Sequence, residues 1–367
     1  MTTMEITAAV LRSYTGPFTI ERVRLDRRLG AHDILVEIAG SGMCHSDLAV
    51  RESAGRSPVP AVLGHEGSGV VVATGTEVSR LEAGDHVVLS FDSCGDCPSC
   101  LGGTPSYCEI FAELNLFGRR TDDQGRLSDD HGAALAPRWF GQSSFADYAV
   151  VRAGNAVKVD PAIPLELLGP LGCGFQTGAG TVLTSLRPRP GDTFAVFGAG
   201  AVGLAAIMAA VACSATVIAV DRHPARLELA EQLGATSVAA TSPDLPDQIL
   251  ALTGGGALCA LDTTGVPKLI NQAMRCLRPA GTLGVVARQR TALHLEPGTL
   301  ERGRRIVHIC EGDAVPRVLI PRLLDLWHRG MFPFDCLIRT YPLSAINDAE
   351  RDSRAGRVVK PVLIPSR

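Results

Sequence analysis

One stretch, DTFAVFGAGAVGLAAIMAAVACSATVIAVDR, restricts the fold of this chain more than any other. It reads as a buried strand, a glycine turn, a helix and a second strand that ends at Asp221. The turn holds G-x-G-x-x-G at Gly198, Gly200 and Gly203. The first glycine permits the tight turn, the second lets a pyrophosphate approach the backbone, and the third lets helix and strand pack closely. The stretch therefore predicts a dinucleotide-binding βαβ unit, with the phosphates at the helix N-terminus.

The residues at the end of the second strand bear on which dinucleotide is bound. Asp221 would accept hydrogen bonds from the adenine-side ribose hydroxyls, and its charge would repel a 2′-phosphate. We therefore expect NAD rather than NADP, although Arg222 weakens that preference because arginine can pair with a phosphate. The uncharged run 193–220 could mimic a membrane helix, but its glycines and β-branched residues favour buried strands around a helix.

Length and composition favour two soluble domains. The chain has 367 residues, more than one typical domain of about 100–200 residues. Its hydrophobic fraction of 46% and charged fraction of 20% are ordinary for a globular protein. A net charge of -3 without a basic stripe predicts neither a nucleic-acid nor a membrane partner. The first residues do not have the pattern of a secretory signal, so we expect a cytoplasmic protein.

Four of the eleven cysteines are clustered in SCGDCPSCLGGTPSYC, with the spacing C-x2-C-x2-C-x7-C. In a reducing compartment, clustered cysteines are more often metal ligands than disulfides. Four thiolates would complete a tetrahedral zinc site with no open position, which is a structural site. The predicted ligands are Cys94, Cys97, Cys100 and Cys108.

Three alternatives for this cluster remain open, namely free surface thiols, an iron–sulfur cluster and a nucleic-acid-binding zinc module. In iron–sulfur proteins, three cysteines this close usually come with a distant fourth. No basic or aromatic residues flank the cluster as a nucleic-acid-binding module would need.

Because a closed metal site does no chemistry, a second site must carry it. GMCHSDL contains Cys44, LGHEGSGVV contains His65, and GPLGCGFQTGAG contains Cys173. Two thiolates and an imidazole would supply three ligands to a second zinc ion and leave one position open for water or substrate. Each stretch alone is weak, but the glycines around all three indicate tight turns rather than the interior of a strand or helix.

The rest of the chain divides by pattern. The second half alternates strands, glycine turns and helices, as in an α/β doubly wound domain. The first 150 residues have short β-rich runs such as DILVEIAG, SGVVVATG and GDHVVLS. The last 55 or so contain one predicted helix, VPRVLIPRLLDLWHRG, and a final strand, VVKPVLI. The polar stretch 119–131 is predicted to be a surface loop.

With these residues in view, the chain resembles the zinc-dependent medium-chain alcohol dehydrogenase family over almost its whole length. GHEGSGVV, the four-cysteine lobe, GCGFQTGAG and GAGAVG occur in the family's order. FGQSSFADYAV and EGDAVPRVLIPRLLDLWHRGMFPFD look most like the aryl and allylic alcohol branch. The resemblance implies an α/β chain with a β-rich GroES-like catalytic domain (1–174 and 313–367) and a Rossmann NAD-binding domain with a doubly wound parallel sheet (175–312). It also implies a homodimer or homotetramer.

The resemblance implies roles residue by residue. Cys44, His65 and Cys173 match the ligands of the catalytic zinc, and Cys94, Cys97, Cys100 and Cys108 match those of the structural zinc, which gives two zinc ions per chain. Glu66 matches an acid that can approach the metal, and Asp47 a carboxylate that orients His65. Ser46 matches the hydroxyl that takes the proton from the alcohol. The residues matched to the cofactor are Thr177 beside the nicotinamide and His45 and Lys360 at the pyrophosphate.

Two departures from the family pattern stand out. Ala49, followed by Val50, occupies the place where many members have a histidine that passes the proton to solvent, which leaves the exit route undefined. Arg288, Gln289 and Arg290 stand where the family usually has small residues near the nicotinamide, which puts cofactor contact and substrate entry there in doubt.

The expected activity is reversible oxidation of a primary apolar alcohol, aryl or allylic, to its aldehyde with hydride transfer to NAD. The zinc would lower the pKa of the alcohol, and the cofactor would carry the hydride. The alternatives are an aliphatic or polyol dehydrogenase of the same superfamily, an aldehyde dismutase that retains its cofactor, and a non-enzymatic NAD-binding protein. The remaining cysteines are predicted to be small buried hydrophobes, and His86 to be a strand residue; these cysteines are Cys213, Cys259, Cys276, Cys310 and Cys336.

Overall fold

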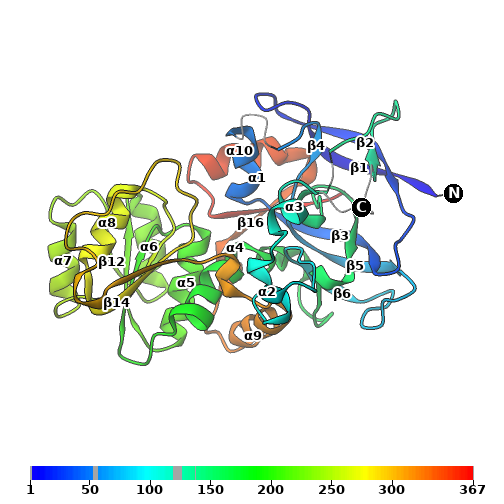
Figure 1. The fold of residues 1–367 in the computed structure, drawn as a ribbon. Coiled ribbons are helices and arrows are strands. Elements are labelled where there is room, and N and C mark those ends of the chain that lie inside the picture. The colour runs from blue at the N-terminus through cyan, green and yellow to red at the C-terminus, as the bar shows by residue number, and fades with distance from the viewer. Residues whose placement is uncertain (1, 53–56, 119–125, 137, 367) are drawn as a thin grey trace. The chain divides into compact units, whose positions relative to one another are not determined.

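The computed structural model describes residues 2–52, 57–118, 126–136 and 138–366 (Figure 1). They form two compact units, and the chain passes from one to the other four times. The first unit comprises Met1–Cys173, Val315–Pro321 and Asp335–Arg367, and the second comprises Gly174–Ala314 and Arg322–Phe334. The domain boundaries expected from the resemblance, after residues 174 and 312, stay predictions. Most of the predicted loop 119–131 lies outside the described residues.

The first unit is built on two sheets. One has the strand order β4-β1-β2-β7, and the other has the order β16-β17-β3-β5-β6-β9, with β8 paired to β3. The strands are β1 (Thr3–Leu11), β2 (Phe18–Asp26), β3 (Asp33–Gly42), β4 (Ala61–Val62), β5 (Glu66–Thr74), β6 (His86–Leu89), β7 (Leu127–Ser128), β8 (Tyr148–Arg152), β9 (Ala156–Lys158), β16 (Ile338–Pro342) and β17 (Lys360–Ile364).

The helices of the first unit are short and lie in the connections between strands. Its α-helices are α1 (His45–Ala49), α2 (Pro98–Leu101), α3 (Phe111–Asn115) and α10 (Ile346–Arg354). Its 3-10 helices are η1 (Val50–Glu52), η2 (Pro105–Tyr107), η3 (Trp139–Gly141), η4 (Ala153–Asn155), η5 (Leu165–Leu167), η6 (Gly169–Gly172) and η11 (Leu343–Ala345). Also, η10 (Phe334–Leu337) begins at the last residue of the second unit.

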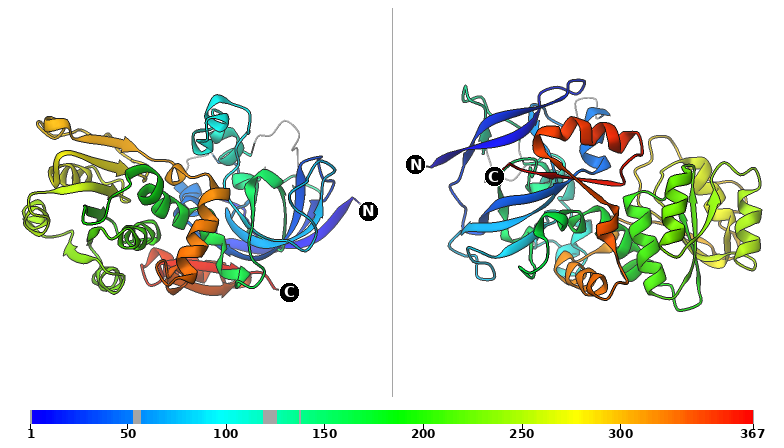
Figure 2. Two further views of the ribbon diagram at one scale, coloured as in Figure 1. Left: turned by 90° about the horizontal axis from the view of Figure 1, so that it is seen from below. Right: turned by 180° about the vertical axis from the view of Figure 1, so that it is seen from behind.

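The C-terminal segment completes the larger sheet. Strand β17 pairs in parallel with β16 and antiparallel with β3, where Val362 lies opposite Gly42 and Leu363 opposite Ser41. In Figure 2 the red C-terminal strands accordingly lie beside the blue N-terminal ones. Residues from both ends of the chain, Ile6 and Leu363 among them, share one buried apolar core.

The second unit contains a six-stranded parallel sheet in the order β12-β11-β10-β13-β14-β15, the doubly wound order 3-2-1-4-5-6. The strands are β10 (Thr193–Phe197), β11 (Thr216–Asp221), β12 (Thr236–Ala239), β13 (Ala257–Asp262), β14 (Leu277–Val285) and β15 (Arg305–His308). The helices are α4 (Gly174–Gly180), α5 (Ala201–Ala212), α6 (Pro224–Gln232), α7 (Leu245–Leu252) and α8 (Pro267–Arg275), with the π-helix η7 (Thr181–Leu186) and the 3-10 helices η8 (Glu301–Gly303) and η9 (Glu311–Asp313).

These elements confirm the predicted fold class. The strand, glycine turn, helix and strand expected around G-x-G-x-x-G are β10, α5 and β11, and β11 ends at Asp221 as expected. The predicted C-terminal helix is α9 (Pro316–His328). Among the described residues, no helix has the length and apolarity needed to cross a bilayer.

The five scattered cysteines are all predicted to be small buried hydrophobes, and one of them is not. Cys259 and Cys276 are buried, as predicted, while Cys213 and Cys310 are half-buried. Cys336 is exposed, so the prediction that it is a buried hydrophobe is wrong. It lies in the short helix η10, where the backbone turns between α9 and β16 and leaves its side chain at the surface. His86 is in strand β6, as predicted.

Candidate functional site

Three turns of the first unit bring Cys44, His65 and Cys173 together. Cys44 is the N-cap of α1 directly after β3, His65 immediately precedes β5, and Cys173 follows η6. One ligand atom from each, together with a carboxylate oxygen of Glu66, forms a group in which all atoms lie within 4.8 Å of one another. Local sequence pattern could not place these three stretches side by side, but the structure does.

Asp47 fixes the orientation of the His65 ring. Its Oδ1 lies 2.8 Å from Nδ1 of His65, and both side chains are fully buried. Burial lowers the pKa of His65, but the negative charge of Asp47, its hydrogen bond and the nearby Cys44 have a larger opposite effect. The pKa of His65 is therefore raised well above its usual value. With Nδ1 held by Asp47, the other ring nitrogen, Nε2, is the one available to a ligand.

The chemistry of this group fits a metal ion. His65 Nε2 is buried and has no hydrogen-bond partner within the part of the chain that the structure describes. A buried, unpaired nitrogen is costly unless a ligand satisfies it. Hydrogen bonding with Cys173, with help from the charge of Lys360, lowers the pKa of Cys44 well below that of a free thiol. Two thiols, one of them readily ionised, and an imidazole match the donors that zinc prefers.

Glu66 is held by Lys360. The ammonium Nζ of Lys360 lies 2.8 Å from each carboxylate oxygen of Glu66 and also donates to the carbonyl of Met43 at 3.4 Å. Burial raises the pKa of Glu66 to about 7, an effect that the positive charge of Lys360 opposes. The contact of Lys360 with a cofactor pyrophosphate stays a prediction, since here its charge is directed to Glu66.

The two residues after Cys44 differ in exposure. His45 is exposed, whereas Ser46 is half-buried with its Oγ 4.0 Å from the sulfur of Cys44. Ser46 is thus near enough to the cluster to contact a molecule bound there. Ala49, half-buried at the end of α1, offers no group that could move a proton.

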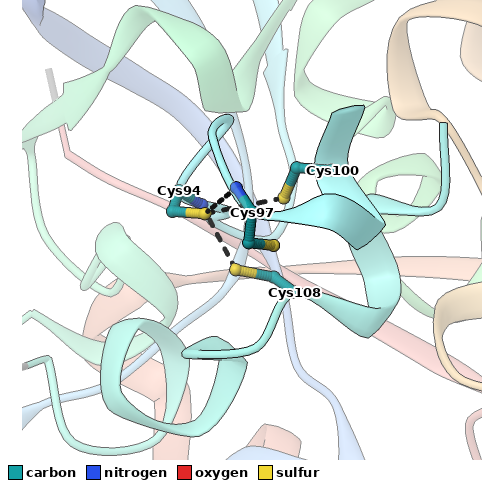
Figure 3. Close-up of side chains that lie close together, drawn as sticks. All are labelled: Cys94, Cys97, Cys100 and Cys108. Carbon is teal, nitrogen blue, oxygen red and sulfur yellow. Dashed lines mark hydrogen bonds between the residues drawn. The ribbon is translucent and has the colours of Figure 1, made fainter. Parts of the chain in front are cut away.

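The four-cysteine lobe forms a second candidate metal site. Figure 3 shows the four sulfurs directed toward one another from helix α2 and the loops around it, and all four lie within 4.8 Å. Backbone N–H groups of Asp96 and Cys97 donate to the sulfur of Cys94 at 3.4 and 3.3 Å. Backbone N–H groups of Glu109 and Cys100 lower the pKa of Cys97 to about 6, which favours the thiolate that binds metal. The prediction of a closed zinc site is consistent with this arrangement.

The glycine turn of the second unit leaves room for a phosphate. A Cβ on Gly203 would lie 1.8 Å from the carbonyl oxygen of Gly198, so helix and strand could not pack as they do. Gly198 itself has a φ of +98°, a conformation that favours glycine. A Cβ on Gly200, by contrast, would meet nothing within 4 Å, so space is open where a pyrophosphate is expected.

Asp221 holds the turn, and Arg226 lies beside it. The carboxylate of Asp221 accepts the backbone N–H of Ala199 at 2.7 Å and that of His223 at 2.9 Å. Nη1 of Arg226, in the first turn of α6, is 4.0 Å from Asp221, and its buried Nε has no partner among the described residues. Sequence reasoning missed Arg226, although a basic residue one turn after the strand-end acid was a visible signal. Arg222 instead donates to the ring of His223 at 3.0 Å.

One predicted cofactor residue, Thr177, and the three residues that depart from the family pattern, Arg288, Gln289 and Arg290, also lie in the second unit. Thr177 on α4 donates through Oγ1 to Glu311 at 3.3 Å. Arg288 and Arg290 are exposed, and Gln289 bonds back to the carbonyl of Ala287. The contact of Thr177 with the nicotinamide stays a prediction, as does the effect of the other three residues on cofactor contact and substrate entry.

Sequence reasoning also missed the residues that surround His65. The indole Nε1 of Trp139 donates to Oδ1 of Asp47 at 2.9 Å, and the ring of Phe140 stacks on that of His65 at 4.4 Å between centroids. Gln142 donates to the carbonyl of His65 at 2.9 Å. The stretch WFGQ has no strand or helix period, so pattern gave no reason to place it at the site.

A doubly wound sheet with a G-x-G-x-x-G turn in one unit, and a group of two thiols and an imidazole in the other, are features of the metal-dependent dehydrogenases. Residues 30–161 match the alcohol dehydrogenase GroES-like domain, and residues 201–327 match the zinc-binding dehydrogenase domain. The chain is also 46% identical over 366 residues to a geraniol dehydrogenase of Castellaniella defragrans, covering 97% of each protein. The protein therefore belongs to the zinc-binding alcohol dehydrogenase family, and it is an oxidoreductase.

Two solved structures show the same fold over the whole chain. An alcohol dehydrogenase zinc-binding domain protein from Burkholderia ambifaria is 47% identical, with a TM-score of 0.97 and 100% of each chain covered. The benzyl alcohol dehydrogenase of Acinetobacter calcoaceticus is 42% identical, with a TM-score of 0.92, 99% of this chain covered and 100% of the other.

Proposed function

We propose that the protein is an NAD-dependent zinc alcohol dehydrogenase that interconverts a primary aryl or allylic alcohol and its aldehyde. The observation that carries the proposal is the buried group of Cys44, His65 and Cys173, with the unpaired Nε2 of His65 directed into it. Three protein ligands leave one position for the substrate oxygen, which is the arrangement of a catalytic rather than a structural zinc site.

In this proposal, different residues bind the metal, accept the proton of the alcohol and bind the cofactor. A zinc ion held by Cys44, His65 and Cys173 would supply Lewis-acid chemistry, and NAD would accept the hydride. Ser46, 4.0 Å from the sulfur of Cys44, would accept the proton of the alcohol. Asp47 holds the His65 ring in one tautomer, and Lys360 balances the charge of Glu66. Gly198, Gly200 and Gly203 would receive the pyrophosphate, and Asp221 the adenosine ribose.

The substrate class rests on the relatives. Two relatives that are more than 40% identical to this chain are named for geraniol, a primary allylic alcohol, and for benzyl alcohol, a primary aryl alcohol. In both alcohols, the carbon that bears the hydroxyl is bonded directly to an unsaturated carbon. We extend that chemistry to this protein and expect a preference for NAD over NADP, because Asp221 is buried and charged at the end of β11.

Other properties of the proposed enzyme follow from the same family. We infer two zinc ions per chain, the second held by Cys94, Cys97, Cys100 and Cys108, whose sulfurs already face one another. The homodimer or homotetramer implied by the resemblance and the cytoplasmic location expected from the sequence are also part of the proposal.

The test is a comparison of substrates with and without metal. Purified protein is given NAD with benzyl alcohol, geraniol or ethanol, and NADH formation is followed by absorbance. We expect turnover of the first two to exceed that of ethanol, to stop after chelation and to return with zinc. A preference for ethanol or a polyol would contradict the substrate class, and turnover that survives complete metal removal would contradict the mechanism.

A further inference from the structure

The carboxylate of Asp47 has more partners than its role toward His65 requires. Its Oδ1 accepts hydrogen bonds from three directions, namely the His65 ring at 2.8 Å, the Trp139 indole at 2.9 Å and the backbone N–H of Gly64 at 3.2 Å. Its Oδ2 accepts the backbone N–H of Cys44 at 3.0 Å. One buried carboxylate therefore connects two candidate metal ligands, Cys44 and His65, with the segment Trp139–Ser143.

This segment holds His65 through three contacts. Trp139 reaches it through Asp47, and Phe140 stacks on its ring with an interplanar angle of 26°. Gln142 donates to the backbone carbonyls of His65 and Ser90 at 2.9 Å each. Its Oε1 also accepts the N–H of Gly67 at 3.2 Å, so one side chain spans the backbone on both sides of Glu66. The imidazole has little freedom to tilt or to slide.

The backbone of the segment is itself constrained. Phe140 and Ser143 have φ values of +50° and +55°, in the left-handed region that non-glycine residues rarely adopt. Such conformations persist when surrounding contacts hold them, and they gather at functional sites. Ser143 supplies those contacts, because its Oγ accepts the N–H of Trp139 at 3.0 Å and donates to the carbonyl of Val62 at 2.7 Å. The segment is thus fastened to the turn that presents His65.

We propose that Trp139 is a positioning residue for the metal ligand His65 and acts through the indole hydrogen bond to Asp47. The inference rests on the proposed zinc site. In it, Trp139 holds Asp47 in place, Asp47 holds the His65 ring, and the ring directs Nε2 to the metal. The indole N–H is a donor only, so Oδ1 of Asp47 is the acceptor in this hydrogen bond.

The alternative is that Trp139 merely fills the core, as its neighbours Leu135 and Phe145 do. The two roles predict different results for Trp139→Phe, which keeps an aromatic ring and removes the N–H. A core-filling role predicts a change in thermal stability alone. A positioning role predicts a change in how the metal is held. The chain offers a matched control because it has only two tryptophans, and Trp327 lies in the second unit.

The first experiment measures zinc release from the zinc-loaded full-length protein to a colorimetric chelator. In Trp139→Phe, we expect the ion of the Cys44–His65–Cys173 site to leave about tenfold faster, at the lower end of the effect typical of groups that support a metal ligand. Release from the four-cysteine lobe and release in Trp327→Phe should both match the unchanged protein. Equal rates in all three proteins would overturn the proposal.

A double-variant cycle tests whether the effect passes through Asp47. In an Asp47→Asn background, adding Trp139→Phe should change zinc release little, because the acceptor is already altered. Full additivity of the two effects would overturn the proposed route. The visible spectrum of the cobalt-substituted protein gives a second readout, since its bands follow ligand geometry and a purely structural role would leave them unmoved.

The unaltered protein gives a test that does not depend on the variant folding. Selective nitrogen labelling of the indoles yields one signal per tryptophan, assigned with Trp327→Phe. The Trp139 signal should shift when zinc is removed and the Trp327 signal should not; a stationary Trp139 signal would overturn the proposal. None of these measurements involves an alcohol, so a protein that passes them and oxidises no alcohol contradicts the proposed function alone. A site that binds no zinc contradicts both.

Discussion

At the scale of single residues, the first unit buries an ion pair, Glu66 with Lys360, at a large cost in lost hydration. The carboxylate and the ammonium are 2.8 Å apart, and their side chains are 0% and 3% exposed. Removing both charges from water is costly, and their attraction offsets that cost only while both are present. The pair is therefore a point at which one substitution leaves a buried, unbalanced charge beside the candidate ligands.

We expect Lys360→Met to lower the free energy of unfolding of the metal-free protein by about 3–5 kcal/mol, the usual cost of breaking a buried ion pair from one side. Urea denaturation measures it. The double variant Glu66→Gln with Lys360→Met removes both charges and should recover much of the loss. A single variant as stable as the unchanged protein would show that the charge of Glu66 is balanced in another way.

Glycines explain why the three candidate ligands could be singled out from sequence. A Cβ on Gly172, beside Cys173, would lie 1.9 Å from the carbonyl of Leu89, and one on Gly42 would lie 2.1 Å from Glu66. Gly64, beside His65, has a φ of +91°. Close approach and left-handed backbone require glycine at these places. The partners of the ligands had no such signal, so Trp139 and Gln142 could not be assigned a role.

At the scale of elements, the βαβ unit of the second unit was predictable and the connections of the first were not. Strands β10 and β11 and helix α5 have strong local signals, namely apolar runs, glycines and a terminal acid. The helix η3, with its left-handed Phe140, is held by contacts with distant turns. Its conformation therefore depends on tertiary structure, which a local pattern does not contain.

A prediction at this scale concerns the turn after β11. Asp221→Asn keeps a side-chain oxygen for the N–H groups of Ala199 and His223 but removes the charge, and Arg222 and Arg226 remain nearby. We expect the ratio of NADP to NAD affinity to rise at least about tenfold, because the repulsion of a 2′-phosphate is lost. Fluorescence titration with each cofactor measures it. An unchanged ratio would mean that Asp221 does not face the ribose.

At the scale of the whole molecule, the eleven cysteines fall into two kinds. Six have sulfurs in the two candidate metal groups. Of the others, burial raises the pKa of Cys259 to about 11 and those of Cys276 and Cys310 to about 12. A thiol with so high a pKa keeps its proton near neutral pH and reacts slowly, since the thiolate is the nucleophile. Of the remaining two, Cys213 is half-buried and Cys336 is exposed.

We expect a thiol-specific reagent at mildly alkaline pH to modify Cys336 first in the zinc-loaded protein. Chelation should then release the six thiols of the two metal groups, while the three thiols with a strongly raised pKa stay protected until the chain unfolds. Peptide mapping by mass spectrometry identifies each site. Rapid modification of all four cysteines of the lobe before chelation would argue against a metal there.

The pairing of Glu66 with Lys360 also affects the order in which parts of the chain can fold during synthesis. Both residues belong to the first unit but are 294 positions apart, and the intervening chain includes the whole of the second unit. On the ribosome, the candidate ligands have all been synthesised by Cys173, while the strand that carries Lys360 is synthesised only after the whole of the second unit. Domains tend to fold as units during synthesis, and long-range contacts form late. We therefore expect the nascent chain to fold its second unit first and to assemble the group of Cys44, His65, Glu66 and Cys173 only after Lys360 has left the ribosome.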